Sequence, residues 1–263
     1  EAASKNNVGV CFDIEQYSMR DLPLQFFEES CEEFDFPAAI ALQAYLRDGE
    51  EDAKRLIAWS KSTGRQVTVR LIKGAYWDYE VVNAEQMGWP VPVWPIKRMT
   101  DACFERMSEL FVRESPRHEG EGGVKLATGS HNMRSIAWIL ALLEKYDLPL
   151  EAYEAQKLFG MGDELRGALT SYGIRVREYV PIGEMIPGMA YLVRRLLENT
   201  SNESWLMASG KDTDKNILLA SPHVPKHSEP TNPDEAIPTC DPVRHALSPT
   251  VEGLDNGRPL ANE

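Results

Sequence analysis

The sequence predicts an α/β fold, a (βα)8 barrel of the TIM type, from three observations. Short apolar or alternating runs recur six times, and each is followed by a helix-like segment. This alternation implies parallel strands joined by right-handed crossovers. No GxGxxG or GxxxxGKS/T loop follows any run, which disfavours doubly wound nucleotide-binding folds. Polar residues gather where the runs end, at the edge of a barrel that carries chemistry.

Each element can be placed in order along the chain. Strands are predicted at 8–14, 38–45, 66–72, 123–128, 150–155 and 174–180. Helices are predicted at 22–34, 49–62, 99–115, 132–146 and 162–173, with a last helix from residue 191. A closed barrel of this type has eight strand–helix units, and six are visible. Because the first strand begins near residue 8, we expect the barrel to lack its first two units in this chain.

Composition restricts the classes of function. The chain has 263 residues, a net charge of −13 and a pI near 5.0, which argues against a nucleic-acid or anionic-membrane surface. An anionic substrate must therefore meet a local basic site. Four cysteines without CxxC spacing predict neither a zinc site nor a disulfide framework, and no metal is expected. With no apolar run of membrane-spanning length and no signal-peptide core, we expect a cytoplasmic protein.

The C-terminal segment differs from the rest. Residues 208–263 contain eight of the 17 prolines and little hydrophobic periodicity. Such a segment buries too little apolar surface to offset its ordering entropy. We therefore expect a barrel domain over residues 1–205 and a connector or tail over residues 206–263.

Polar residues follow each predicted strand. They are Asp13 and Glu15, which close the first strand, Gln43 at the end of the second, Lys73 at the end of the third, Ser130, His131 and Asn132 after the fourth, and Gln156 and Tyr179 at the ends of the last two. In a barrel these positions meet at one mouth. Taken singly, Asp13, Ser130 and Asn132 have a simpler interpretation as helix caps.

The segment YLVRRLLEN, residues 191–199, raises a second question. As a helix it places Tyr191, Arg194, Arg195 and Glu198 on one face, opposite four apolar residues. One interpretation is an ordinary solvated face. The other is a clamp for a carboxylate, because guanidinium groups pair bidentately with planar anions.

The third strand and its continuation, VTVRLIKGAYWDYE, favour the functional interpretation. Arg70 alternates out of phase with Val69 and Leu71, and a turn with little side-chain bulk, KGA, precedes Trp77. Glycine allows close approach of a ligand to the backbone, and tryptophan can stack on a flat ring. The run RLIKGAYWD resembles the proline dehydrogenase domain of the bifunctional flavoenzyme proline utilization A.

The resemblance covers most of residues 8–205. VGVCFDIEQY, ALQAYLRD, LATGSHN, YEAQKLFGMGDEL and REYVPIGEMIPGMAYLVRRLLEN are similar to family motifs in the family's order. Three departures stand out. Gly129 and Ser130 precede His131 where the family has Ala-Thr, Phe159 replaces a common histidine, and no residue supplies the lysine that the family carries on an earlier strand.

The resemblance implies FAD-dependent oxidation of L-proline to Δ1-pyrroline-5-carboxylate, with electrons passed to a quinone. Arg194 and Arg195 would bind the proline carboxylate, and Glu198 would orient an arginine. Tyr179, Tyr191 and Leu158 would enclose the ring. Asp13, a catalytic residue with Arg70 in this assignment, would lie near the clamp and tune its charge.

The resemblance also assigns the flavin contacts. Arg70 would lie near the redox-active nitrogen and stabilise the anionic reduced ring. Further contacts would come from Gln43, Lys73, Gly74, Ala75, Trp77, Lys97, Thr100, Ser130, His131 and Asn132. Simpler interpretations remain for Arg70 as a salt-bridged strand end, for Trp77 as a core or rim aromatic residue, and for Thr100 as a helix N-cap.

Two other functions remain open from the sequence. One is a different FAD barrel, similar to methylenetetrahydrofolate reductase, and the other is a catalytically silent scaffold. The resemblance implies an aldehyde dehydrogenase module beyond the connector, and quinone reduction implies a transient, peripheral association with the inner membrane. No nucleic-acid partner is expected for this segment.

Overall fold

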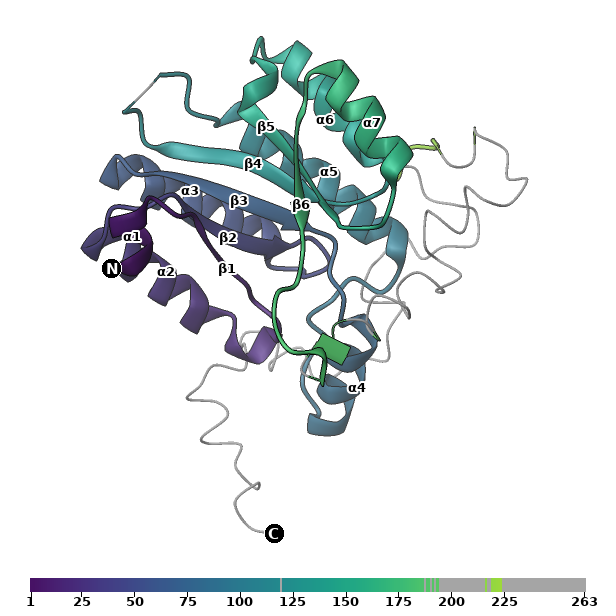
Figure 1. The fold of residues 1–263 in the computed structure, drawn as a ribbon. Helices are drawn as coiled ribbons and strands as arrows, with labels where there is room; N and C mark the ends of the chain where they lie inside the picture. Colours follow the sequence, from purple (N-terminus) through teal and green to yellow (C-terminus); the bar gives the residue numbers. More distant parts are fainter. Residues whose placement is uncertain are drawn as a thin grey trace.

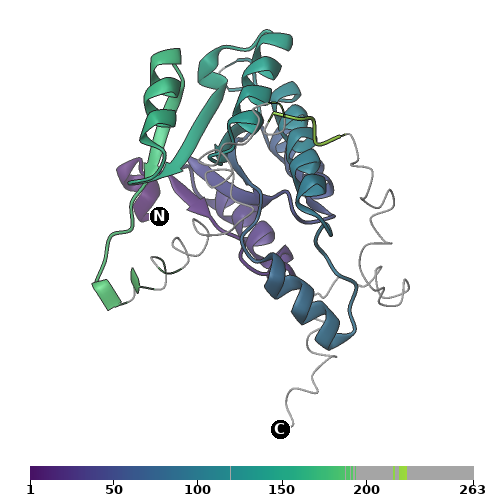
Figure 2. The ribbon, with the colours of Figure 1, turned by 90° about the vertical axis from the view of Figure 1, so that its right-hand side faces the viewer.

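One parallel sheet forms the framework of the molecule. The computed structural model describes residues 1–118 and 120–186, and beyond them residues 188, 189, 191, 193, 216 and 219–223. In this part the sheet order is the chain order. Its strands are β1 (Val10–Phe12), β2 (Ala38–Gln43), β3 (Gln66–Ile72), β4 (Gly123–Gly129), β5 (Tyr153–Leu158) and β6 (Arg175–Tyr179). The sheet curls into a half-barrel, so the predicted parallel α/β architecture is confirmed over six strands (Figures 1 and 2).

Helices connect the strands and cover the convex face (Figure 1). They are α2 (Asp21–Glu33), α3 (Gly49–Thr63), α5 (Lys97–Arg113), α6 (Met133–Lys145) and α7 (Asp163–Tyr172). Two more helices are not part of this layer: the short α1 (Ala2–Asn6) precedes β1, and α4 (Trp77–Met87) lies apart from the sheet. Single 3-10 turns lie at Tyr17–Met19 and Leu150–Ala152. Adjacent parallel strands require such helical crossovers, because a tight hairpin turn can join only antiparallel strands.

The hydrophobic core lies between the sheet and these helices. Val67, Val69 and Leu71 of β3 are buried against it, and Phe104 and Phe111 of α5 are fully buried opposite. Successive strand residues point to opposite faces, so Thr68 and Arg70 point to the concave face instead. This alternation places the apolar residues under the helices and the polar residues inside the half-barrel.

Three local predictions were wrong. The fifth strand begins at Tyr153 after a 3-10 turn, so Gln156 lies inside β5 and not beyond its end. The helix predicted from residue 99 begins at Lys97, so Thr100 lies in its first turns and is not the N-cap. The helix α4 was not predicted, although it separates the third strand from α5.

Part of the C-terminal segment packs on the barrel helices. Arg98 of α5 donates to the Pro222 carbonyl over 2.6 Å, and Arg134 of α6 donates to the Leu219 carbonyl over 2.7 Å. His223 Nε2 lies 3.1 Å from the buried carboxylate of Glu105. The rest of the predicted connector, 206–263, lies outside the described residues except for residue 216. Among the described helices, none is long and apolar enough to span a bilayer.

Candidate active site

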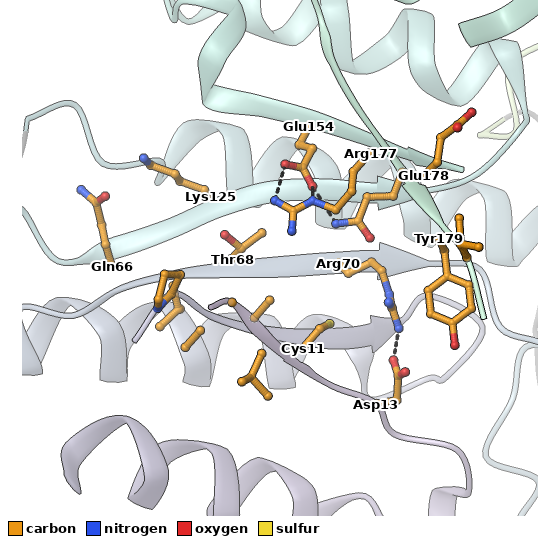
Figure 3. A pocket seen from close by; sticks show the side chains of 18 residues that line it. Cys11, Asp13, Gln66, Thr68, Arg70, Lys125, Glu154, Arg177, Glu178 and Tyr179 are labelled. Carbon is orange, nitrogen blue, oxygen red and sulfur yellow. Dashed lines mark hydrogen bonds and ion pairs between the residues drawn. The ribbon is translucent and has the colours of Figure 1, made fainter. Parts of the chain in front are cut away.

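The concave face of the half-barrel contains a cavity of about 590 Å³. Its walls are the inward-facing residues of the strands, among them Cys11, Thr68, Lys125 and Gln156 (Figure 3). At its carboxyl-end rim the Arg70 guanidinium forms an ion pair with Asp13, and Tyr179 at the end of β6 lies beside Arg70 (Figure 3). Arg70 is therefore salt-bridged at the end of its strand, and it also lies at the rim of the cavity.

Gln43 of β2 holds the loop that follows β1. The Gln43 Nε2 donates to the Ile14 carbonyl over 2.6 Å, and the side chain is almost fully buried. Its Oε1 is also buried, and no hydrogen-bond partner is found for it in the part of the chain that the structure describes. A buried acceptor without a partner costs about 1–3 kcal/mol, so this oxygen marks a place where a ligand donor would be favourable.

A second network fixes the far end of the same loop. The Tyr17 amide donates to Glu80 over 2.8 Å, and the Tyr17 hydroxyl donates to Asp48 over 2.6 Å. Arg20 donates to Asp48 over 2.6 Å and faces Asp52 at 3.6 Å. Burial raises the pKa of Asp52 to about 6, although Arg20 opposes the shift. Asp13 is thus attached to a loop anchored to β2, α3 and α4.

The turn after β3 combines a lysine with a strained glycine. Gly74 has φ of 123°, and a Cβ there would lie 2.4 Å from ring atoms of the buried Tyr45. Lys73 forms an ion pair with Asp101 of α5, which also lies 2.9 Å from Lys97. Although burial works in the opposite direction, the two lysines lower the pKa of the Asp101 carboxyl. Lys73 and Lys97 are therefore brought together beside the turn by their shared partner Asp101.

Two more predicted flavin contacts lie near this turn. Trp77 follows it in the sequence, and Thr100 is next to Asp101, the partner of Lys73. Trp77 begins α4, is 38% exposed and donates its indole N–H to the Trp94 carbonyl over 2.7 Å. Its side chain is therefore held by Trp94 and still partly exposed. Thr100 is buried on α5, on the same helix as Lys97.

The loop after β4 carries Ser130, His131 and Asn132. The Asn132 side chain accepts a hydrogen bond from the Ser135 amide at 3.2 Å, so it is the N-cap of α6, and Ser130 Oγ accepts from the Asn132 amide at 3.2 Å. The capping interpretation is thus correct for Asn132. His131 is different, because its Nε2 is buried without a hydrogen-bond partner among the described residues, and burial, assisted by the charge of Lys157, lowers its pKa.

The predicted wall for a substrate ring is partly visible. The rings of Tyr179 and Tyr191 are 5.7 Å apart between centroids and tilted by 38°. Leu158 is the last residue of β5 and pairs in register with Tyr179. Leu158 and Tyr191 are thus both neighbours of Tyr179, whereas Arg194, Arg195 and Glu198 lie outside the described residues.

Sequence reasoning missed an ion pair inside the half-barrel. Arg177 Nε lies 2.8 Å from Glu154, which also accepts a hydrogen bond from Gln156 at 2.8 Å (Figure 3). The signal was available, because Glu154, Gln156 and Arg177 share the inward phase of β5 and β6. A buried lysine, Lys157, was missed because it occupies the apolar phase of β5.

Comparison with solved structures gives a close match to this architecture. The structure of proline utilization A (PutA) from Bdellovibrio bacteriovorus inactivated by N-propargylglycine superimposes with a TM-score of 0.80 at 43% sequence identity. The match covers 91% of this chain and 24% of that chain. The structure of a mutant of proline utilization A (PutA) from Bradyrhizobium japonicum superimposes with a TM-score of 0.74 at 28% sequence identity.

Sequence comparison agrees. The bifunctional protein PutA of Rhizobium meliloti is 32% identical over 212 residues, which cover 78% of this chain and 17% of that protein. Proline dehydrogenase 1 of Bacillus subtilis is 27% identical over 205 residues, covering 78% of this chain and 59% of that protein. This chain thus spans less than two thirds of each relative. Because the family model described as proline dehydrogenase matches residues 1–208, the chain belongs to the proline dehydrogenase family.

Proposed function

We propose that this chain binds FAD at the carboxyl ends of its strands and oxidises L-proline to Δ1-pyrroline-5-carboxylate. The observation that carries the proposal is the Arg70–Asp13 ion pair at the rim of the concave face. A fixed guanidinium beside a strand end is suited to stabilise negative charge on a bound ring. Membership of a flavin-dependent family supports the same assignment.

The residues at the strand ends fit a flavin. Two buried polar atoms without described partners, Gln43 Oε1 and His131 Nε2, are available for its hydrogen-bonding groups. Lys73 and Lys97 provide positive charge for its phosphates, and Trp77 provides an aromatic face. We propose that Gly74, Ala75, Thr100, Ser130 and Asn132 line the same site.

The substrate would be held by an apolar wall and a cationic clamp. Tyr179 lies beside Arg70, and Tyr191 and Leu158 are its neighbours, so we propose that these three residues form a wall for a small saturated ring. We propose that Arg194 and Arg195 bind the carboxylate and that Glu198 fixes one of the guanidinium groups, since bidentate pairs give both affinity and orientation.

The proposed reaction divides its tasks among these residues. FAD, when bound, supplies the two-electron acceptor that takes a hydride from the ring carbon next to the nitrogen. Arg70 stabilises the negative charge that accompanies this transfer, and Asp13 holds Arg70 in place. The tyrosine wall orients the ring and excludes water from it. Loss of the proton from the ring nitrogen completes the conversion to the imine.

The complete protein is proposed to be larger than the described half-barrel. Two further strand–helix units, one carrying a lysine at a strand end, would close the barrel between β1 and β6, which are the edge strands of the described sheet. The segment 206–263 would lead to an aldehyde dehydrogenase module, by analogy with the bifunctional relatives. A quinone, reached by transient contact with a membrane, would receive the electrons.

Flavin bleaching tests the proposal. We expect the purified protein, after addition of FAD, to show a flavin spectrum whose 450 nm band is lost when proline is added without oxygen. Retention of the band with proline but bleaching with NADH would favour the reductase-like alternative. A protein that takes up no FAD would favour the scaffold, and either result would contradict the proposed activity.

A further inference from the structure

A buried lysine joins three elements beside the predicted flavin loop. Lys157 of β5 has a side chain that is only 4% exposed. Its Nζ lies 2.8 Å from Asp163, the first residue of α7, and 2.9 Å from Glu178 of β6. Burial favours the neutral amine, yet the two carboxylates outweigh it and raise the pKa of Lys157. The lysine therefore carries its charge into a packed interior position.

The ion pair to Asp163 closes the turn between β5 and α7. This turn, residues 160–162, contains two glycines with left-handed backbone, Gly160 with φ of 78° and Gly162 with φ of 62°. Glycine loses more conformational freedom on ordering than any other residue. The ion pair from Lys157 to Asp163 joins the two ends of the turn. It therefore restricts the conformational freedom that the two glycines leave to the turn.

His131 packs directly on this turn. A Cβ built on Gly162 would lie 3.0 Å from His131 Cδ2, so the glycine backbone and the imidazole are in close contact. The neighbouring ring atom, Nε2, would lie 3.6 Å from the same Cβ position, and it is buried with no hydrogen-bond partner among the described residues. The position of the turn thus determines where this nitrogen lies.

We propose that Lys157 is a positioning residue for His131: through Asp163 and Glu178 it locks the turn 160–162 against the imidazole and so fixes Nε2 for contact with the flavin. This rests on the proposed FAD site and deepens it. The charge of Lys157 has a second effect, because a nearby cation opposes protonation of the imidazole, so the ring is held as a neutral group.

The first test needs no flavin. The His131 ring signal is followed by NMR over pH in the flavin-free protein and assigned by its loss in His131→Gln. We expect Lys157→Met to raise the pKa of His131 and Lys157→Arg to keep it low. The matched control is Lys54→Met, an exposed lysine of α3 for which no ion pair is found among the described residues. An unchanged His131 pKa in a folded Lys157→Met protein would overturn the electrostatic part.

The second test separates position from charge. Asp163→Asn keeps the lysine but removes its link to the turn, so we expect FAD to bind roughly three- to tenfold more weakly while the pKa of His131 is not raised. The control is Glu164→Gln, an exposed acid in the same first turn of α7 for which the described part of the chain shows no ion pair; the change removes a charge near the helix N-terminus. It should change FAD affinity by less than about twofold.

The outcomes distinguish this inference from the proposed function. If the parent binds FAD and Asp163→Asn binds it equally well, the positional role of Lys157 is wrong. If the parent binds no FAD, the proposed function fails, and the NMR titration still decides whether Lys157 sets the protonation of His131. Should Lys157→Met fail to fold, as judged by its melting temperature, Lys157→Arg and Asp163→Asn carry the tests.

Discussion

Arg70 reaches Asp13 across an intervening strand. Arg70 lies on β3 and Asp13 follows β1, and β2 runs between them. In register with Arg70, β2 presents Ala41, and Ala39 lines the same concave cavity. These small side chains leave room for the guanidinium to pass over the sheet. Because Asp13 is more than half exposed, the pair adds little stability, and its consequence is the orientation of Arg70.

Arg70→Lys should separate flavin binding from flavin reduction. Lysine retains the charge but lacks the planar fork, so it cannot face Asp13 and a ligand in the same geometry. We expect FAD affinity to stay within a few-fold of the parent and proline-driven reduction to slow by about tenfold or more, which corresponds to about 1.4 kcal/mol. Stopped-flow absorbance measures the rate.

Arg65→Lys is the matched control for this change. Arg65 precedes β3 at the opposite end of the strand and pairs with Asp35 at 2.8 Å, far from the carboxyl-end rim. Its reduction rate should equal that of the parent. A native rate in Arg70→Lys would show that the guanidinium of Arg70 has no role in the hydride transfer.

The alternation of strands and helices could be predicted because each strand carries an apolar phase under a helix. β3 is the clearest case, since Val67, Val69 and Leu71 alternate with polar residues. By contrast, α4 escaped prediction because its buried residues are Glu80 and Ala84, which make no apolar stripe.

The candidate site was predictable to a different extent. The residues at strand ends could be found from topology, because the carboxyl ends of parallel strands share one edge. The end of β5 could not be predicted from the sequence, because Lys157 occupies a position in the apolar phase of the strand. Its charge is compensated by Asp163 and Glu178, which only the fold brings near. Pairings such as Glu154 with Arg177 likewise depend on register.

Gly74→Ala should destabilise the turn after β3. A backbone φ of 123° is unfavourable for alanine, and the new methyl group would overlap the buried Tyr45 ring. We expect a loss of about 1–3 kcal/mol in the free energy of unfolding, measured by urea denaturation. Gly167→Ala provides the contrast, because Gly167 lies within α7 with open space around it and should gain about 0.5–1 kcal/mol. Equal stability of Gly74→Ala and the parent would refute the assigned strain.

Asp52 should make stability depend on pH in a defined direction. Its pKa of about 6 in the folded protein exceeds the value near 3.9 of an unfolded chain. Its contribution is therefore fully present below about pH 4 and is lost as the pH rises through 6. Asp52→Asn should match the parent near pH 4 and exceed its stability by about 2–3 kcal/mol at pH 7.5.

The control for Asp52 is a neighbouring acid of the same helix turn. Glu51 is exposed in the first turn of α3, so Glu51→Gln should change stability by less than about 0.5 kcal/mol at either pH. Unfolding by urea at both pH values measures all three proteins. A difference between parent and Asp52→Asn that stays constant with pH would contradict the raised pKa.

Arg195→Met should weaken binding of the substrate carboxylate. A buried charge-assisted hydrogen bond contributes about 1.5–3 kcal/mol, and an unpaired carboxylate in the site adds to the loss. Since each 1.4 kcal/mol is tenfold, we expect proline or tetrahydrofuroate to bind roughly ten- to a hundredfold more weakly, with Arg194→Met tested beside it. Arg113→Met, at the exposed end of α5, should bind like the parent. Titration of the bound flavin measures each affinity. Affinities within about twofold of the parent for both Arg195→Met and Arg194→Met would contradict the clamp. The segment would then be an ordinary solvated helix face, since an exposed charge contributes under about 1 kcal/mol.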